Sequence, residues 1–388
     1  MRTLVKNSRI ITPYEIKVGY SLVVEDDKIE DMIKNENIDE SVFDKVIDLK
    51  GKYLSSGFID IHNHGNYGHD AMEGTYDALE SMGNYHIKNG VTGYLATTMT
   101  NSTENTIRAI KNVASYIHEK NKEGSKVLGL YLEGPYFSQE KKGAQPPEYI
   151  KAPDIEELEM LLKEGKDTVK VVAIAPELKN AKEAIRYLKK QGITISAGHT
   201  NANYQEAMKG IERGITQATH LYNGMRGFSH REPGVLGAVL TDERVACEMI
   251  CDGIHIHKAA MNMAVKLKGK DKIILISDAM MAAGLKDGKY QLGGQDVFVK
   301  DREARLESGA LAGSTLTLNK AVYNMVHLVG VSLNEAVQMA SLNPAKAIGI
   351  DNYKGSIEIG KDADIIAFNE NLDVSFVMVE GHVIDSQL

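Results

Sequence analysis

Eight short apolar runs, separated by stretches of helical periodicity, dominate the middle of the chain. The intervening stretches, such as residues 103–120, 155–163, 180–191 and 203–213, repeat apolar positions at the spacing of amphipathic helices. Strands buried on both faces appear as near-continuous apolar runs. The runs are residues 57–61, 91–97, 127–132, 169–175, 193–197, 215–219, 245–251 and 272–277. This alternation predicts an α/β fold, a parallel (β/α)8 TIM barrel, with a doubly wound open sheet as the alternative.

Both ends of the chain have a different pattern, with short β-rich segments broken by charged turns. Neither end has enough strands to bury a sheet by itself. We therefore expect the two termini to pair into one small β-sandwich domain. The predicted division is residues 1–53 plus 354–388 for the sandwich and 54–353 for the barrel that carries the active site.

Composition narrows the class of protein without changing this architecture. The 388 residues are 43% hydrophobic and 25% charged, which is ordinary for a globular protein. A net charge of −8 gives no general basic field, so we expect no nucleic-acid partner. No window of 18 apolar residues predicts a membrane span. The first seven residues carry charges where a secretion signal needs an apolar stretch, so we expect a cytoplasmic protein.

Side chains able to bind metal gather at the carboxyl ends of the runs, where barrel enzymes place their active sites. The first run ends in His62-Asn63-His64, and alternation along a strand puts both imidazoles on one side. Four other runs end in an acidic or imidazole side chain: Glu133, His199, His220 and Asp278. Imidazole and carboxylate ligands together suit Zn, Fe, Mn or Co. The six residues therefore predict a divalent metal site.

The same pattern allows plainer interpretations of single residues. A lone His-x-His can be two polar loop residues. Cys247, Cys251 and His255 resemble a zinc pattern by spacing, but the segment that holds the cysteines is typical of a strand. We therefore expect both thiols to pack as small hydrophobic groups.

With these features, the whole chain resembles the amidohydrolase superfamily and, within it, the N-acetylglucosamine-6-phosphate deacetylase family. The matching motifs are GFIDIHNHG at 57–65, LEGPY at 132–136, AGHT at 197–200, THLYNGM at 219–225, REPG at 231–234, DGIH at 252–255, SDAM at 277–280 and LAGS at 311–314. Many superfamily members bridge two metals with a carboxylated Lys after strand four, where this chain has Ala175-Pro176. The resemblance implies that Glu133 bridges instead, and that one or two ions bind per subunit.

The resemblance also implies the reaction. The N-acetyl group of N-acetylglucosamine 6-phosphate would be hydrolysed to glucosamine 6-phosphate and acetate, in amino-sugar catabolism and recycling. Hydroxide generated at the metal attacks the amide, and Asp278 acts as base and then as acid. The implied substrate-binding residues are Ala144, Gln145, Asn223, Gly224, Arg231, Asp252, Gly253, Ile254, His255, Leu311, Ala312 and Gly313. In the family this Arg can come from a neighbouring subunit, so we expect a homodimer.

One position departs from the family pattern, and two other functions compete. Some members have a His that contacts the acetamido carbonyl where this chain has Gln145. A Gln amide can donate a hydrogen bond but cannot become cationic. The nearest alternative is an amidohydrolase for a cyclic amide or an aminopurine, disfavoured by the missing strand-four Lys and the Arg231 loop. The other is a metal-holding barrel without catalysis, disfavoured because every ligand is present.

Overall fold

The eight apolar runs form eight parallel strands that lie side by side in chain order. The strands are β8 (Phe58–Asn63), β11 (Val91–Thr97), β12 (Lys126–Leu132), β13 (Val169–Ile174), β14 (Thr194–Ala197), β15 (Ile215–Ala218), β16 (Ala246–Ile250) and β17 (Ile273–Ile276). Asp278 N donates to His62 O at 2.9 Å, and a parallel bridge joins Asn63 to Ala279. These contacts join the first strand to the eighth. The predicted barrel is confirmed, and the open doubly wound sheet is wrong.

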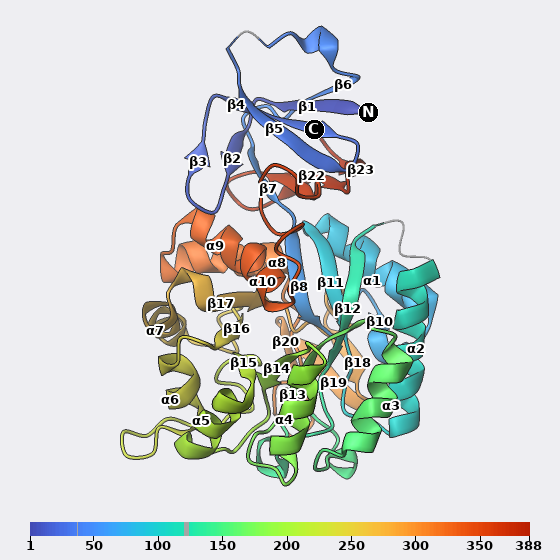
Figure 1. Cartoon of the computed structure of the whole chain (residues 1–388), viewed down its shortest axis with the longest axis vertical. Helices are drawn as coiled ribbons and strands as arrows, with labels where there is room; N and C mark the ends of the chain where they lie inside the picture. The colour runs from blue at the N-terminus through green and yellow to red at the C-terminus, as the bar shows by residue number, and fades with distance from the viewer. Residues whose placement is uncertain (37, 120–123) are drawn as a thin grey trace.

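Helices lie between the strands and cover the outside of the barrel (Figure 1). The computed structural model describes residues 1–36, 38–119 and 124–388. The helices are α1 (Tyr76–Lys88), α2 (Thr103–Glu119), α3 (Ile155–Gly165), α4 (Ala181–Lys190), α5 (Tyr204–Arg213), α6 (Gly234–Thr241), α7 (Lys258–Lys268), α8 (Leu318–Asn324), α9 (Leu333–Ala340) and α10 (Leu342–Ala347). The four helices predicted between the runs are α2 to α5, and the predicted end of α2 at Lys120 lies outside the described residues. Within those residues, every helix is too short or too polar to span a membrane.

Two sheets built from both ends of the chain form the small domain at the top of Figure 1. The first holds β1 (Arg2–Lys6), β4 (Tyr20–Glu25), β5 (Lys28–Lys34) and β6 (Lys45–Asp48). The second holds β2 (Arg9–Ile11), β3 (Ile16–Lys17), β7 (Tyr53–Ser56), β21 (Ile365–Phe368), β22 (Val374–Val379) and β23 (His382–Ser386). Leu22 and Val24 from one sheet share an apolar core with Ile365 and Phe376 from the other. The β-sandwich is thus confirmed. The predicted boundary between residues 53 and 54 falls inside β7, and the division into domains stays a prediction.

A three-stranded antiparallel sheet interrupts the chain after the last barrel strand. It consists of β18 (Gly288–Leu292), β19 (Gln295–Lys300) and β20 (Glu303–Leu306). Its buried Leu292 and Val297 pack with Met99, Ala144 and Met280, which belong to loops at the carboxyl ends of the strands. This sheet therefore covers part of the end of the barrel where the predicted ligands lie.

Both cysteines are buried and form no disulfide. Burial raises the pKa of the Cys247 thiol to about 12, so the thiol stays protonated at neutral pH. Cys251, on the same side of the strand, is equally buried. The predicted packing role is confirmed for both.

Candidate metal centre

The six predicted metal ligands all lie at the carboxyl ends of barrel strands. His62 is the fifth residue of β8, His64 directly follows that strand, and Glu133 directly follows β12. The other three lie two residues beyond β14, β15 and β17: His199, His220 and Asp278. Their φ angles are 44°, 29° and 48° in the same order. Non-glycine residues persist in this costly conformation where surrounding structure holds them, most often at functional sites.

The six side chains form two adjacent buried groups. Within each group the candidate ligand atoms lie within 4.8 Å of one another: His62, His64 and Asp278 in one, Glu133, His199 and His220 in the other. Glu133 contacts both groups. Its Oε1 lies 3.0 Å from His220 Nε2 and 3.2 Å from His199 Nε2, and its Oε2 lies 3.3 Å from His64 Nε2. Glu133 therefore lies between the two ligand groups and would be shared by ions held in both.

The donor set fits a divalent cation. His62 Nε2 is fully buried and has no hydrogen-bond partner, although it lies 3.5 Å from Asp278 Oδ1 and 3.7 Å from Glu133 Oε1. Four imidazoles and two carboxylates therefore converge in one buried place. Imidazole nitrogen and carboxylate oxygen are the ligands that Zn, Fe, Mn and Co share. These six residues would hold one or two such ions.

Hydrogen bonds orient two of the imidazoles toward this centre. His199 Nδ1 lies 2.9 Å from the Lys141 carbonyl oxygen, and His220 Nδ1 lies 3.1 Å from that of Asn223. A carbonyl can only accept, so Nδ1 is the donor to it, and Nε2 is the nitrogen that can ligate a cation once it gives up the proton it shares with Glu133. Both Nε2 atoms face Glu133.

The electrostatics of the centre keep its carboxylates ionised. Burial opposes the charged form of Glu133, but hydrogen bonds from His199, His220 and His64 outweigh burial and hold its pKa well below the usual value. Burial likewise opposes ionisation of Asp278, and the charges of His62 and His64 lower its pKa instead. Conversely, burial would lower the pKa of His220, but Glu133 raises it to about 9. The carboxylates are therefore ready to bind a cation or to accept a proton.

A cavity of about 380 Å³ opens onto the centre. Seven of the predicted substrate-binding residues line it: Ala144, Gln145, Asn223, Gly224, His255, Leu311 and Gly313. Four others in the described chain lie next to the lining without forming it: Asp252, Gly253, Ile254 and Ala312. Asp252 contacts His255, because its Oδ2 lies 2.6 Å from His255 Nδ1 and its Oδ1 accepts the His255 backbone N–H at 2.8 Å. The substrate roles of all these residues stay predictions.

Gln145 lies against the metal centre itself. Its Nε2 donates to Glu133 Oε2 at 2.7 Å, its Oε1 accepts the Thr100 N–H at 3.0 Å, and its side chain is buried. Gln145 therefore contacts the carboxylate that touches both ligand groups. The same side chain also lines the cavity, and its contact with the acetamido group stays a prediction.

Two arginines differ in their position relative to the cavity. Arg231 is exposed at the tip of a turn closed by hydrogen bonds between Ser229 and Glu232, away from the cavity of its own chain. Arg305 on β20 lines the cavity and pairs with Leu311 through a β-bridge. Sequence reasoning missed Arg305, because it lies far along the connection after the eighth strand and not at a strand end. A Gly-rich, β-like stretch follows the eighth run at residues 284–313 of the sequence, and this stretch is the signal that could have drawn attention to Arg305.

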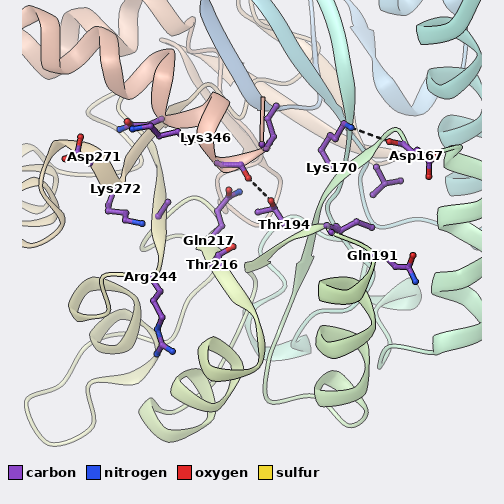
Figure 2. Close-up of a pocket in the computed structure, with 18 of the residues that line it drawn as sticks. Asp167, Lys170, Gln191, Thr194, Thr216, Gln217, Arg244, Asp271, Lys272 and Lys346 are labelled. Atoms are coloured by element: carbon purple, nitrogen blue, oxygen red, sulfur yellow. Dashed lines mark hydrogen bonds between the residues drawn. The ribbon is translucent and has the colours of Figure 1, made fainter. Parts of the chain in front are cut away.

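A larger cavity, of about 570 Å³, lies at the opposite, amino-terminal end of the strands (Figure 2). Lys170, Lys272 and Lys346 are among its lining residues, and none of the six predicted ligands is. Arg244, also in its wall, is engaged by Asp242 through hydrogen bonds of 2.9 and 2.5 Å. Asp167 and Asp271 also line this cavity, and neither of the candidate metal groups among the described residues lies in it.

The barrel and its buried ligand set define a metal-dependent hydrolase of the barrel class, and comparisons with known proteins agree. The amidohydrolase family matches residues 53–384, and the chain belongs to this family. It is 41% identical to an N-acetylgalactosamine-6-phosphate deacetylase of Escherichia coli O157:H7, over 87% of this chain and 89% of that protein. It is 38% identical to an N-acetylglucosamine-6-phosphate deacetylase of Bacillus subtilis (strain 168), over 98% and 96%. A structure of the Mycobacterium smegmatis N-acetyl-D-glucosamine-6-phosphate deacetylase, a mutant in complex with N-acetyl-D-glucosamine-6-phosphate, matches with 30% identity and a TM-score of 0.92, covering 99% of this chain and all of that one.

Proposed function

We propose that the chain hydrolyses the N-acetyl group of N-acetylglucosamine 6-phosphate, giving glucosamine 6-phosphate and acetate. The observation that carries the proposal is the buried set of six candidate ligands, five of which line a cavity of about 380 Å³. The identity to deacetylases of N-acetylated hexosamine 6-phosphates supports the choice of substrate. We further propose a homodimer, on the family resemblance.

The side chains support hydrolysis as follows. A bound divalent ion supplies a water of lowered pKa and polarises the acetyl carbonyl. Asp278 Oδ1 faces His62 and His64, at 3.5 and 3.3 Å from their Nε2 atoms, which leaves Oδ2 to take the proton of the attacking water. Asp278 then returns this proton to the departing amine, which is a poor leaving group as an anion. The carbon–nitrogen bond breaks, and the water oxygen ends in acetate.

Acetate release tests the proposal directly. We expect rapid release from N-acetylglucosamine 6-phosphate and much slower release from unphosphorylated N-acetylglucosamine, with metal per chain measured on the same sample. N-acetylgalactosamine 6-phosphate belongs in the panel as a second candidate substrate, because the E. coli relative carries that name. The proposal would be contradicted if fully metallated protein released no acetate from any phosphorylated sugar. A cyclic amide or an aminopurine would then be the substrate class to test.

We also propose that a guanidinium group reads the phosphate, and the structure offers Arg305 for this role. Among the described lining residues it is the one Lys or Arg. Glu303 Oε2 lies 2.8 Å from Arg305 Nε and 2.7 Å from Nη2, and Nη1 donates to the Gly309 carbonyl at 2.8 Å. A guanidinium has five N–H groups, so two remain free to donate to a phosphate. The pairing with Glu303 fixes their direction.

Arg305→Ala is expected to raise KM for the phosphorylated sugar roughly 10- to 150-fold, since a hydrogen bond to a charged group contributes about 1.5–3 kcal/mol. KM for the unphosphorylated sugar should change little. Arg302→Ala, on the exposed turn of the same sheet, is the matched control. Arg231→Ala should have the same selective effect only if a second subunit brings Arg231 to this cavity. An unchanged KM in Arg305→Ala beside a raised one in Arg231→Ala would assign the phosphate to Arg231.

A further inference from the structure

One fully buried carboxylate has no part in the proposed reaction. Glu248 lies in the middle of β16, between the neighbours Cys247 and Met249, and its exposed fraction is 0%. Side chains alternate along a strand, so Glu248 points to the opposite side of β16 from the two cysteines, toward the inside of the barrel. A carboxylate in that place is costly unless it is well hydrogen-bonded.

Three donors converge on the two oxygens of Glu248. Its Oε2 lies 2.9 Å from His62 Nδ1 and accepts the His220 backbone N–H at 3.1 Å. Its Oε1 accepts from Gln217 Nε2 at 2.5 Å. Amide and backbone N–H groups only donate, so both oxygens act as acceptors, and His62 Nδ1 is left as the donor of the third hydrogen bond.

This arrangement fixes which nitrogen of His62 faces the metal centre. With the proton held on Nδ1 by Glu248, the lone pair lies on Nε2, which is buried, unpartnered and directed toward Asp278 and Glu133. His199 and His220 are oriented by carbonyl oxygens, whereas His62 is oriented by a carboxylate. A carboxylate behind an imidazole sets the ring orientation and makes the imidazole a stronger ligand.

We propose that Glu248, held in turn by Gln217, is the positioning residue that makes the His62, His64 and Asp278 group able to hold a second ion. In the other group the imidazoles of His199 and His220 are oriented by carbonyl oxygens, and Glu248 touches only the backbone N–H of His220. We therefore expect this group to hold an ion without Glu248. The inference rests on the proposed metal centre and not on the identity of the sugar.

Gln217, the partner of Glu248, is buried at the floor of a second cavity. It lines the larger cavity at the amino-terminal end of the strands, where Figure 2 shows it in the same wall as Thr194 and Lys346. Its Oε1 is buried without a partner. Glu has the size of Gln, so it can be placed at residue 217, where its carboxylate would accept hydrogen bonds instead of donating them.

The test is metal binding, counted as ions per chain by elemental analysis over a series of Zn²⁺ buffers. We expect two ions in the wild type. In Glu248→Met, we expect one tightly held ion and an affinity for the second lowered about 10- to 100-fold, the usual effect of losing a partner behind a ligand. Glu177→Gln is the matched control, because that carboxylate accepts from Thr200 Oγ1 and Asn201 N near His199 without contacting His62.

A rescue variant separates positioning from a merely structural role. In Glu248→Gln/Gln217→Glu, the new amide oxygen can accept from His62 Nδ1 and His220 N while its NH2 donates to the new carboxylate. We expect this swap to regain most of the affinity for the second ion. Circular dichroism of the metal-free variants checks that each is folded.

Three outcomes would overturn the proposal. The first is a wild-type protein that binds only one ion. The second is Glu248→Met with wild-type affinity for both ions. The third is a folded swap variant whose affinity for the second ion is as low as that of Glu248→Met. A wild type that binds two ions yet releases no acetate would refute the proposed function and leave this inference standing.

Discussion

An Asp278→Asn variant is expected to fold normally and to lose at least about 10²-fold in kcat, the lower range for loss of a general acid–base group. The Asn side chain keeps the shape of Asp278 and an oxygen toward His62 and His64, which lie 3.5 and 3.3 Å away. It cannot accept the proton of the attacking water, nor return one to the amine. Because the imidazoles hold the pKa of Asp278 below its ordinary value, the wild-type group is in its basic form at neutral pH.

Acetate release measured per metal-loaded chain gives the kcat of this variant. A lower affinity for metal is then not mistaken for a loss of proton transfer. Asp296→Asn is a suitable control, since Asp296 is an exposed partner of Lys289 in the sheet after the barrel. KM should change much less than kcat. Near wild-type turnover of fully metallated Asp278→Asn would remove Asp278 from the mechanism.

Glu133→Ala is expected to abolish activity by removing metal from both groups. Glu133 lies within 3.0 to 3.3 Å of the Nε2 atoms of His199, His220 and His64, so no other side chain among the six contacts as many ligands. Loss of this shared carboxylate should weaken metal binding by more than the 10- to 100-fold that loss of an outer partner produces. The remaining buried imidazoles would also repel a cation whenever they are protonated.

Elemental analysis and acetate release after chelation and metal readdition provide the measurement. Wild-type protein should regain its ions and its activity, whereas Glu133→Ala should regain neither at the same metal concentration. Glu133→Ala with a full complement of ions would contradict the bridging position. One retained ion with residual activity would show that the two groups bind metal independently of Glu133.

Gln145, which stands where some family members have a His, fits the metal centre. A Gln amide can donate to Glu133 Oε2 and accept from Thr100 N at once, as the distances of 2.7 and 3.0 Å show. Gln145 therefore ties the loop after β12 to the carboxylate at the centre of the site. Its neutral side chain adds no positive charge beside the proposed ions.

Much of this protein followed from local features of the sequence. The eight apolar runs predicted the barrel because a strand buried on both faces must be apolar along its length. The ligands could be found because a strand has a definite end, and parallel strands bring their carboxyl ends to one edge. His62 and His64 faced the same way because strand side chains alternate.

The tertiary structure decided what depends on contacts between distant segments. Arg305 reaches the cavity only because the sheet after β17 folds over the barrel end, and Arg231 remains outside the cavity of its own chain. Glu248 looked like one polar residue in an apolar strand, and its role depends on His62, 186 positions away. The positive φ values of His199, His220 and Asp278 are likewise imposed by the surrounding fold. Alternation and strand ends are encoded along the chain, whereas hydrogen bonds across the barrel exist only after it closes.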